Sequence, residues 1–129
     1  MSTHSVISVI DDDASVRAAT NNLLGSHGYA VQMFASAEEF LHSAQLKDSS
    51  CVIADVQMPA MSGLDLLMHM RTQGYKASFI FITAFPDESV RARALKAGAV
   101  CFLTKPFPAP ELISCVETVL RRHGCRTGK

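Results

Sequence analysis

Cys51-Val52-Ile53-Ala54-Asp55 is the stretch that decides the fold, because a short apolar run ends there in a carboxylate. Apolar runs without alternation are typical of strands that are covered on both faces, as in parallel sheets. Similar runs occur at residues 6–10, 79–82 and 100–104, and polar residues end or follow each one. The sequence therefore predicts several parallel strands that all end beside chemically active side chains.

Helical patterns lie between these runs. The predicted strands cover residues 6–10, 29–34, 51–54, 79–82 and 100–103, and the predicted helices begin near residues 15, 36, 62, 87 and 110. Ser36 and Glu39 have the spacing of a capping box. Ser62 with Asp65, and later Asp87, suit two further helix starts. The helical side chains expected to point inward are Val16, Ala19, Leu23, Leu24, Phe40, Leu41, Ala44, Leu64, Leu67, Met68, Val90, Ala94, Ala97, Leu112, Ile113, Val116, Val119 and Leu120.

A strand followed by a helix, five times over, requires parallel pairing through right-handed crossovers. Five such units predict an α/β fold of the flavodoxin-like type, a (βα)5 three-layer sandwich around a parallel five-stranded sheet in the order 2-1-3-4-5. Ligands bind at the carboxyl edge of such a sheet, beside its first and third strands. We expect a single domain over residues 1–129, with a core at about 5–122 and a tail or truncated linker at 123–129.

The composition is that of one globular domain. The chain has 129 residues, of which 48% are hydrophobic and 19% charged, so it suits a single core and is not of disordered composition. It has no apolar run near the roughly 20 residues that cross a membrane and no secretory leader pattern. We therefore expect a cytoplasmic protein with no membrane partner. The four cysteines lack the clustering of a zinc site.

The formal net charge is zero, but the charges are unevenly distributed. Residues 1–64 hold seven acidic and two basic residues, whereas residues 65–129 hold five acidic and ten basic ones. A basic region of this kind can bind nucleic acid, but no recognition-helix motif accompanies it. We therefore expect a solvated basic face and no nucleic-acid partner for this domain.

Five polar residues end or follow the predicted strands: Asp11, Asp12, Asp55, Thr83 and Lys105. Parallel strands bring such residues to one edge of the sheet. Two ionised carboxylates about 4 Å apart repel by roughly 4 kcal/mol at an effective dielectric constant near 20, so three of them need a cation. Oxygen ligands without Cys or His favour Mg²⁺, with Mn²⁺ as a substitute. The pattern indicates a site for a divalent metal and a phosphoryl group.

With these motifs in this order, the chain resembles the receiver (CheY-like) domain of two-component response regulators over about residues 5–122. Among receivers it is closest in motif to the FixJ-type subfamily, whose regulators often carry a helix-turn-helix output domain. Each motif alone is weak, but together they are specific. They are Asp11-Asp12, Ala54-Asp55-Val56-Gln57-Met58-Pro59 followed by Met61-Ser62-Gly63, Thr83-Ala84, and Lys105-Pro106-Phe107.

The resemblance implies a role for each residue of the site. Asp55 would be the phosphoacceptor, a carboxylate nucleophile that takes a phosphoryl group from a phosphohistidine. Lys105 and Thr83 would contact the phosphoryl oxygens. The ligands of Mg²⁺ would be the side chains of Asp11, Asp12 and Asp55 and the backbone carbonyl of Gln57.

The resemblance also implies a switch and its partners. Thr83 would move toward the phosphoryl group, and Phe102 would rotate into the vacated space, which changes the surface of the fourth helix, fifth strand and fifth helix. The donor would be a sensor histidine kinase or a phosphotransfer protein. A homodimer through the fourth helix and fifth strand would be a possible result of phosphorylation. No enzyme activity is expected beyond self-phosphorylation and self-dephosphorylation.

Two further expectations concern the loops around the site. The resemblance implies a cis peptide bond at Lys105-Pro106, a rare geometry outside such positions. Gln57 and Phe85 lie two residues past Asp55 and Thr83, at positions that flank the attacking water in receivers. A bulky apolar side chain at Phe85 would screen the phosphoryl group and slow its loss, although simple loop packing explains this residue equally well.

Two alternatives remain open. One is a module that keeps the fold and binds proteins without being phosphorylated. The other is a phosphatase of the haloacid-dehalogenase type, because residues 11–13 contain that family's Asp-x-Asp pattern. Such an enzyme needs a further acid pair after the lysine, and only Glu111 and Glu117 follow Lys105, on a predicted helix. A phosphatase of this type would also give Asp55 no role in the reaction.

Overall fold

The computed structural model of the protein describes residues 6–43, 49–58 and 60–122. Strands and helices alternate along these residues, and each element starts close to the residue expected from the sequence. The elements are β1 (Val6–Ile10), α1 (Ala14–Ser26), β2 (Ala30–Phe34), α2 (Ala37–Leu41), β3 (Ser49–Asp55), α3 (Gly63–Thr72), β4 (Ser78–Thr83), α4 (Glu88–Lys96), β5 (Cys101–Thr104) and α5 (Ala109–Arg122).

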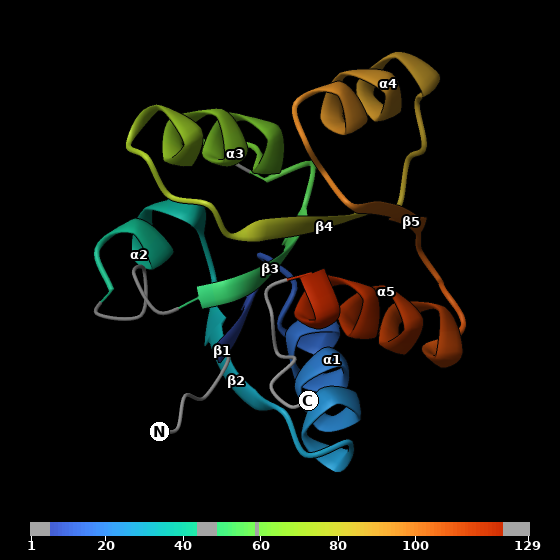
Figure 1. Ribbon diagram of the computed structural model, residues 1–129. Helices are drawn as coiled ribbons and strands as arrows, with labels where there is room; N and C mark the ends of the chain where they lie inside the picture. The colour runs from blue at the N-terminus through green and yellow to red at the C-terminus, as the bar shows by residue number, and fades with distance from the viewer. Residues whose placement is uncertain (1–5, 44–48, 59, 123–129) are drawn as a thin grey trace.

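The five strands form one parallel sheet in the order β2-β1-β3-β4-β5. Helices α2, α3 and α4 cover one face of the sheet, and α1 and α5 cover the other (Figure 1). The predicted three-layer flavodoxin-like architecture and strand order are therefore confirmed. None of the described helices combines the length and apolar character needed to cross a membrane.

The alternation of side chains along β4 divides the core into two layers. Phe79 and Phe81 pack with residues of α2, α3 and α4, whereas Ile80 and Ile82 pack with residues of α1 and α5. All four side chains are completely buried. Burial of each contributes about 1.5–3 kcal/mol. A strand held by both layers places its last residue, Thr83, firmly at the carboxyl edge.

Side-chain caps start the helices that lead away from that edge. The capping box between Ser62 and Asp65 is present at α3, and Asp87 accepts backbone hydrogen bonds at the start of α4, both as predicted. Ser36 likewise caps α2 by accepting the amide hydrogen bond of Glu39. Helix α1 begins earlier than expected, because the side chain of Asp13 accepts hydrogen bonds from the two amides of residues 15 and 16.

Some predicted core positions were wrong. Met68 is 56% exposed, because the inward stripe of α3 runs through Leu66, Leu67 and Met70, and Met68 falls beyond its edge. On α1, Ala19 is exposed in the same way. Helix α2 is only one short segment, Ala37–Leu41, and the predicted core residue Ala44 lies outside the described residues.

Candidate functional site

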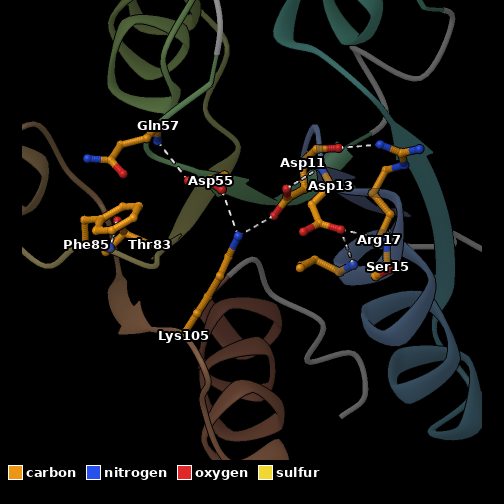
Figure 2. A network of polar contacts seen from close by, with 10 residues as sticks. Asp11, Asp13, Ser15, Arg17, Asp55, Gln57, Thr83, Phe85 and Lys105 are labelled. Carbon is orange, nitrogen blue, oxygen red and sulfur yellow. Dashed lines mark hydrogen bonds and ion pairs between the residues drawn. The ribbon is translucent and has the colours of Figure 1, made fainter.

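The carboxyl ends of four strands bring four of the five predicted site residues together, as Figure 2 shows for Asp11, Asp55, Thr83 and Lys105. Asp11 directly follows β1, Asp55 and Thr83 are the last residues of β3 and β4, and Lys105 directly follows β5. The strand register aligns these ends, because Ile10 pairs with Ala54, Asp55 with Ile82, and Thr83 with Thr104. The sheet topology alone thus converts four distant sequence positions into one site.

Lys105 is at the centre of the charged groups. Its Nζ atom lies 2.8 Å from Oδ2 of Asp55 and 3.0 Å from Oδ2 of Asp11. Hydrogen bonds between ionised partners at these lengths are about twice as strong as neutral ones. The ammonium group therefore holds the ends of β1 and β3 to the end of β5.

The acids of the site carry more negative charge than Lys105 balances. Asp11, Asp12 and Asp55 each offer a carboxylate oxygen, and these oxygens lie within 4.8 Å of one another. Asp11 is fully buried and Asp55 is 7% exposed, whereas Asp12 is open to solvent. Mg²⁺ prefers this kind of site, in which one or two carboxylates share the ion with water molecules. The donor set therefore fits a hard divalent cation.

Burial and hydrogen bonds shift the pKa values of two groups in the site. Burial raises the pKa of the Asp11 carboxyl, although hydrogen bonds from the Asp13 amide and from Lys105 oppose the shift. Burial lowers the pKa of Lys105, but its hydrogen bonds to Asp55 and Asp11 outweigh that effect, and its pKa is raised. Lys105 therefore remains an ammonium at neutral pH, while the buried Asp11 favours an additional positive charge nearby.

The same local turn follows β1, β3 and β4. A side-chain oxygen of the first residue accepts a hydrogen bond from the backbone amide two residues later, the usual geometry of Asx and Ser/Thr turns. The pairs are Asp13 to Asp11 at 2.9 Å, Gln57 to Asp55 at 2.8 Å, and Phe85 to Thr83 at 3.0 Å, with the amide residue named first in each. This turn leaves the second oxygen of each carboxylate facing Lys105.

Gly63 lets α3 start very close to the end of β3. A Cβ atom at this position would lie 2.6 Å from the backbone oxygen of Asp55 and 3.0 Å from Cε1 of Phe81. The Gly63 amide donates a 3.0 Å hydrogen bond to the carbonyl of Val56, which closes the loop. A side chain here would push α3 away from the acidic site.

Two aromatic residues flank the site in different environments. Phe85 is 71% exposed, and Figure 2 shows it on the same side of Asp55 as Gln57. Phe102 is half-buried on β5 and packs against the core layer below α4. A cavity of about 200 Å³ adjoins Phe102 and is also lined by Asp87, Arg91 and Thr104. Space for a side-chain movement therefore exists beside Phe102.

An apolar groove borders the site at Lys105. It has a volume of about 640 Å³ and lies between α1 and the loop after β5. The lining residues are Val16, Ala19, Thr20, Leu23, Ala84, Lys105, Pro106, Phe107 and Ala109. The peptide bond between Lys105 and Pro106 in this loop is cis, as the resemblance implied.

The residues expected for a haloacid-dehalogenase-type phosphatase are not assembled. Asp13, the second acid of its Asp-x-Asp pattern, has its Oδ1 bound by two amides at the start of α1. Glu111 and Glu117 are exposed on α5 and do not join the acidic cluster found among the described residues. In contrast, Asp55 lies at the centre of the site.

The fold, the acidic cluster and the lysine together define a receiver domain. Residues 7–117 match the family described as the response regulator receiver domain. The chain therefore belongs to this family, the receiver domains of two-component response regulators.

Relatives and solved structures agree with this assignment. The chain is 40% identical to the response regulator protein TodT of Pseudomonas putida, over 91% of this chain and 52% of TodT. It is 38% identical to the transcriptional regulatory protein FixJ of Bradyrhizobium diazoefficiens, over 95% of this chain and 60% of FixJ. The chain thus spans about half the length of these relatives.

The structural comparison gives the same result. The structure of the response regulator StyR superimposes with a TM-score of 0.88 at 36% identity and covers 96% of this chain, which spans 63% of StyR. The structure of FixJ-N superimposes with a TM-score of 0.81 at 33% identity, covering 92% of this chain and 94% of FixJ-N. The predicted similarity to the FixJ-type subfamily is therefore confirmed.

The sequence pattern did not indicate every residue that shapes the site. Asp13 was not recognised as the cap of α1, although an Asp three residues before Val16 is a recognisable signal. Arg17 donates a 2.6 Å hydrogen bond from Nη1 to the backbone oxygen of Asp11. A long side chain that reaches back to a carbonyl has no signature in sequence.

Proposed function

We propose that Asp55 accepts a phosphoryl group from the phosphohistidine of a sensor histidine kinase or a phosphotransfer protein. The observation that carries this proposal is the position of the Asp55 carboxylate, which is held by Lys105 inside the acidic cluster. One carboxylate oxygen attacks phosphorus, the nitrogen–phosphorus bond breaks, and the histidine nitrogen keeps the electron pair. Lys105 balances the charge on the phosphoryl oxygens during this transfer.

The site would bind Mg²⁺ through the side chains of Asp11, Asp12 and Asp55 and the backbone carbonyl of Gln57. The closely spaced carboxylates and the solvent-facing Asp12 support this assignment. Bound Mg²⁺ would neutralise phosphoryl oxygens and align them with the nucleophile. Mn²⁺ would substitute, because it accepts the same oxygen ligands.

Thr83 and Phe102 would convert phosphorylation into a change of surface. The hydroxyl oxygen of Thr83 accepts the Phe85 amide, so its own proton is free to be donated to a phosphoryl oxygen. Movement of Thr83 toward Asp55 would open space that Phe102 enters from β5. The cavity beside Phe102 at the start of α4 supports this proposal, since a rotating ring needs room.

The phosphodonor would rest in the apolar groove between α1 and the loop after β5. This groove includes Lys105 in its lining, so a partner bound there is next to Asp55.

After phosphorylation, the face formed by α4 and β5 would support a homodimer. We propose no nucleic-acid contact by this domain and a cytoplasmic location, where ATP-dependent kinases supply the phosphoryl group.

We further propose that residues 1–129 form a single receiver domain whose only reactions are its own phosphorylation and dephosphorylation. Loss of the phosphoryl group requires water to reach phosphorus in line with the bond to Asp55. Phe85 and Gln57 lie on the same side of Asp55 and would flank that approach, and Phe85 would slow it.

The deciding experiment is the intact mass of the protein after incubation with acetyl phosphate and Mg²⁺. We expect one added phosphoryl group in the wild type, and none in Asp55→Asn or after chelation of the metal. Glu117→Gln is the control, because it removes an exposed carboxylate on α5 that lies outside the acidic cluster. No added mass in the wild type with either Mg²⁺ or Mn²⁺ would contradict the proposal and favour the unphosphorylated binding module.

A further inference from the structure

Arg17 lies on α1 beside the acidic turn that follows β1. Its Nη1 atom donates a 2.6 Å hydrogen bond to the backbone oxygen of Asp11 (Figure 2). Three consecutive acids, residues 11–13, precede it in the chain. Nevertheless, the ion pairs found among the described residues are both made by Lys105. Arg17 thus uses its guanidinium on a carbonyl, which leaves the neighbouring carboxylates available for another cation.

Asp11 is held from several directions as a result. Its amide donates to the carbonyl of Phe34, and its carboxylate accepts from the Asp13 amide. Arg17 binds its carbonyl, which belongs to the peptide group that joins Asp11 to Asp12. The direction in which Asp12 leaves the backbone therefore depends on the contact with Arg17.

Within the acidic cluster, Asp12 is the residue whose side-chain direction depends most on a fixed backbone. Its side chain is exposed, yet one of its carboxylate oxygens lies within 4.8 Å of those of Asp11 and Asp55. An exposed side chain on a mobile peptide would sample many directions. A peptide fixed by Arg17 limits those directions to ones that keep the three oxygens together.

We propose that Arg17 is a positioning residue for the divalent cation site. By holding the carbonyl of Asp11 it orients the peptide before Asp12, so that the Asp12 carboxylate converges with Asp11 and Asp55. Residues that orient metal ligands without touching the metal commonly affect metal affinity. This proposal rests on the Mg²⁺ site of the proposed function.

The charge of Arg17 and its hydrogen bond are expected to change the affinity for Mg²⁺ in opposite directions, so a substitution can distinguish them. A guanidinium beside a divalent cation repels it, so loss of the charge alone would strengthen Mg²⁺ binding. Loss of the hydrogen bond would weaken Mg²⁺ binding by releasing the turn. The proposal is that the geometric effect dominates.

The experiment is calorimetric titration of the metal-free protein with Mg²⁺, which needs no phosphoryl transfer. We expect Arg17→Met to raise the Kd for Mg²⁺ by about ten-fold. Arg17→Lys, which keeps a hydrogen-bond donor, should recover part of the lost affinity. Arg121→Met, which removes an exposed arginine on α5, serves as the control and should match the wild type. Thermal unfolding without Mg²⁺ verifies that each variant is folded.

Unchanged or tighter Mg²⁺ binding by Arg17→Met would overturn the proposal. If Arg17→Met does not fold, Arg17→Gln replaces it with the same expected weakening, because its amide nitrogen ends two bonds short of the position of Nη1, the atom that binds the Asp11 carbonyl. Failure of the wild type to bind Mg²⁺ would overturn the metal site itself and the role of Arg17 with it. A wild type that binds Mg²⁺ but is not phosphorylated would instead contradict only the proposed phosphoryl transfer.

Discussion

The turns after β1 and β3 have nearly the same hydrogen bonds but different surroundings. In each turn, one carboxylate oxygen accepts the amide two residues later and the other accepts Lys105, for Asp11 as for Asp55. Asp11 has no exposed surface and is braced by Arg17, whereas Asp55 is 7% exposed and lies against the start of α3 at Gly63. These surroundings fit the roles that we propose for the two aspartates, Asp11 as a fixed ligand and Asp55 as a reachable nucleophile.

The local turn alone therefore does not determine how accessible an aspartate is. The turn sets the direction of the carboxylate, and the residues packed outside it decide whether a partner can reach it. The largest test removes the group that both turns share, and the smaller tests change the surroundings of one turn at a time.

Replacing Lys105 by Met should have the largest effect. Both carboxylates would lose their cation, and the phosphoryl oxygens would lose a charged partner in the transition state. Loss of one such electrostatic contact costs about 10²–10³-fold in rate. We expect a decrease of that size in phosphorylation by acetyl phosphate, measured by intact mass over time.

Lys76→Met is the control for Lys105→Met, because Lys76 is an exposed lysine between α3 and β4 and makes no ion pair among the described residues. It should react like the wild type. A Lys105→Met protein that is phosphorylated at the wild-type rate would show that Mg²⁺ alone balances the charge at both turns.

Replacing Gly63 by Ala should disturb the turn after β3 and spare the turn after β1. The new Cβ would lie 2.6 Å from the backbone oxygen of Asp55, so the start of α3 must shift. Overpacking of this kind costs about 1–3 kcal/mol in the free energy of unfolding. Urea unfolding measures this loss.

Gly25→Ala is the matched control, because a Cβ there meets nothing within 4 Å and Gly25 lies inside α1. Alanine is favoured over glycine in helices, so this variant should be more stable than the wild type by about 0.5–1 kcal/mol. Equal stability of Gly63→Ala and the wild type would mean that α3 moves without cost and that Gly63 does not determine the geometry at Asp55.

The sequence predicted the fold and the meeting of Asp11, Asp55 and Lys105 because both follow from the order and periodicity of the apolar runs. Apolar runs between helical stretches require a parallel sheet, and that sheet gathers Asp11, Asp55 and Lys105 whatever the details of packing. The exposed Met68 and the contact of Arg17 could not be predicted in the same way. They depend on the rotation of a helix about its axis and on the path of one long side chain, which tertiary packing decides.

A third turn of the same type, after β4, allows a weaker test. Phe85 donates its amide to Thr83, and its ring is 71% exposed beside the site. If the ring restricts water, Phe85→Ala should lose its phosphoryl group a few-fold faster than the wild type, measured by intact mass after removal of acetyl phosphate. Met33→Ala, which shortens another exposed apolar side chain on β2, is the control. An unchanged lifetime would assign Phe85 to loop packing.

The smallest effect concerns the pH dependence of stability in the metal-free protein. Burial raises the pKa of Asp11 in the folded state above its ordinary value of 3.8, so the folded protein holds this proton more tightly than the unfolded chain does. The stabilisation that comes from this proton is fully present below pH 3.8 and is lost as the pH rises through the raised pKa of Asp11. Asp11→Asn lacks this titration, so its stability relative to the wild type should increase with pH.

Asp87 provides a control of opposite sign for Asp11→Asn. Hydrogen bonds from the side chain and backbone of Ser89 and from the Val90 amide lower the pKa of Asp87. Its stabilising contribution is therefore present above the ordinary pKa and is lost as the pH falls. Asp87→Asn should lose stability relative to the wild type as the pH rises from ~3 to ~7. Urea unfolding with a chelator across this range compares the two slopes, and a downward slope for Asp11→Asn would mean that the hydrogen bonds from the Asp13 amide and Lys105 outweigh the burial of Asp11.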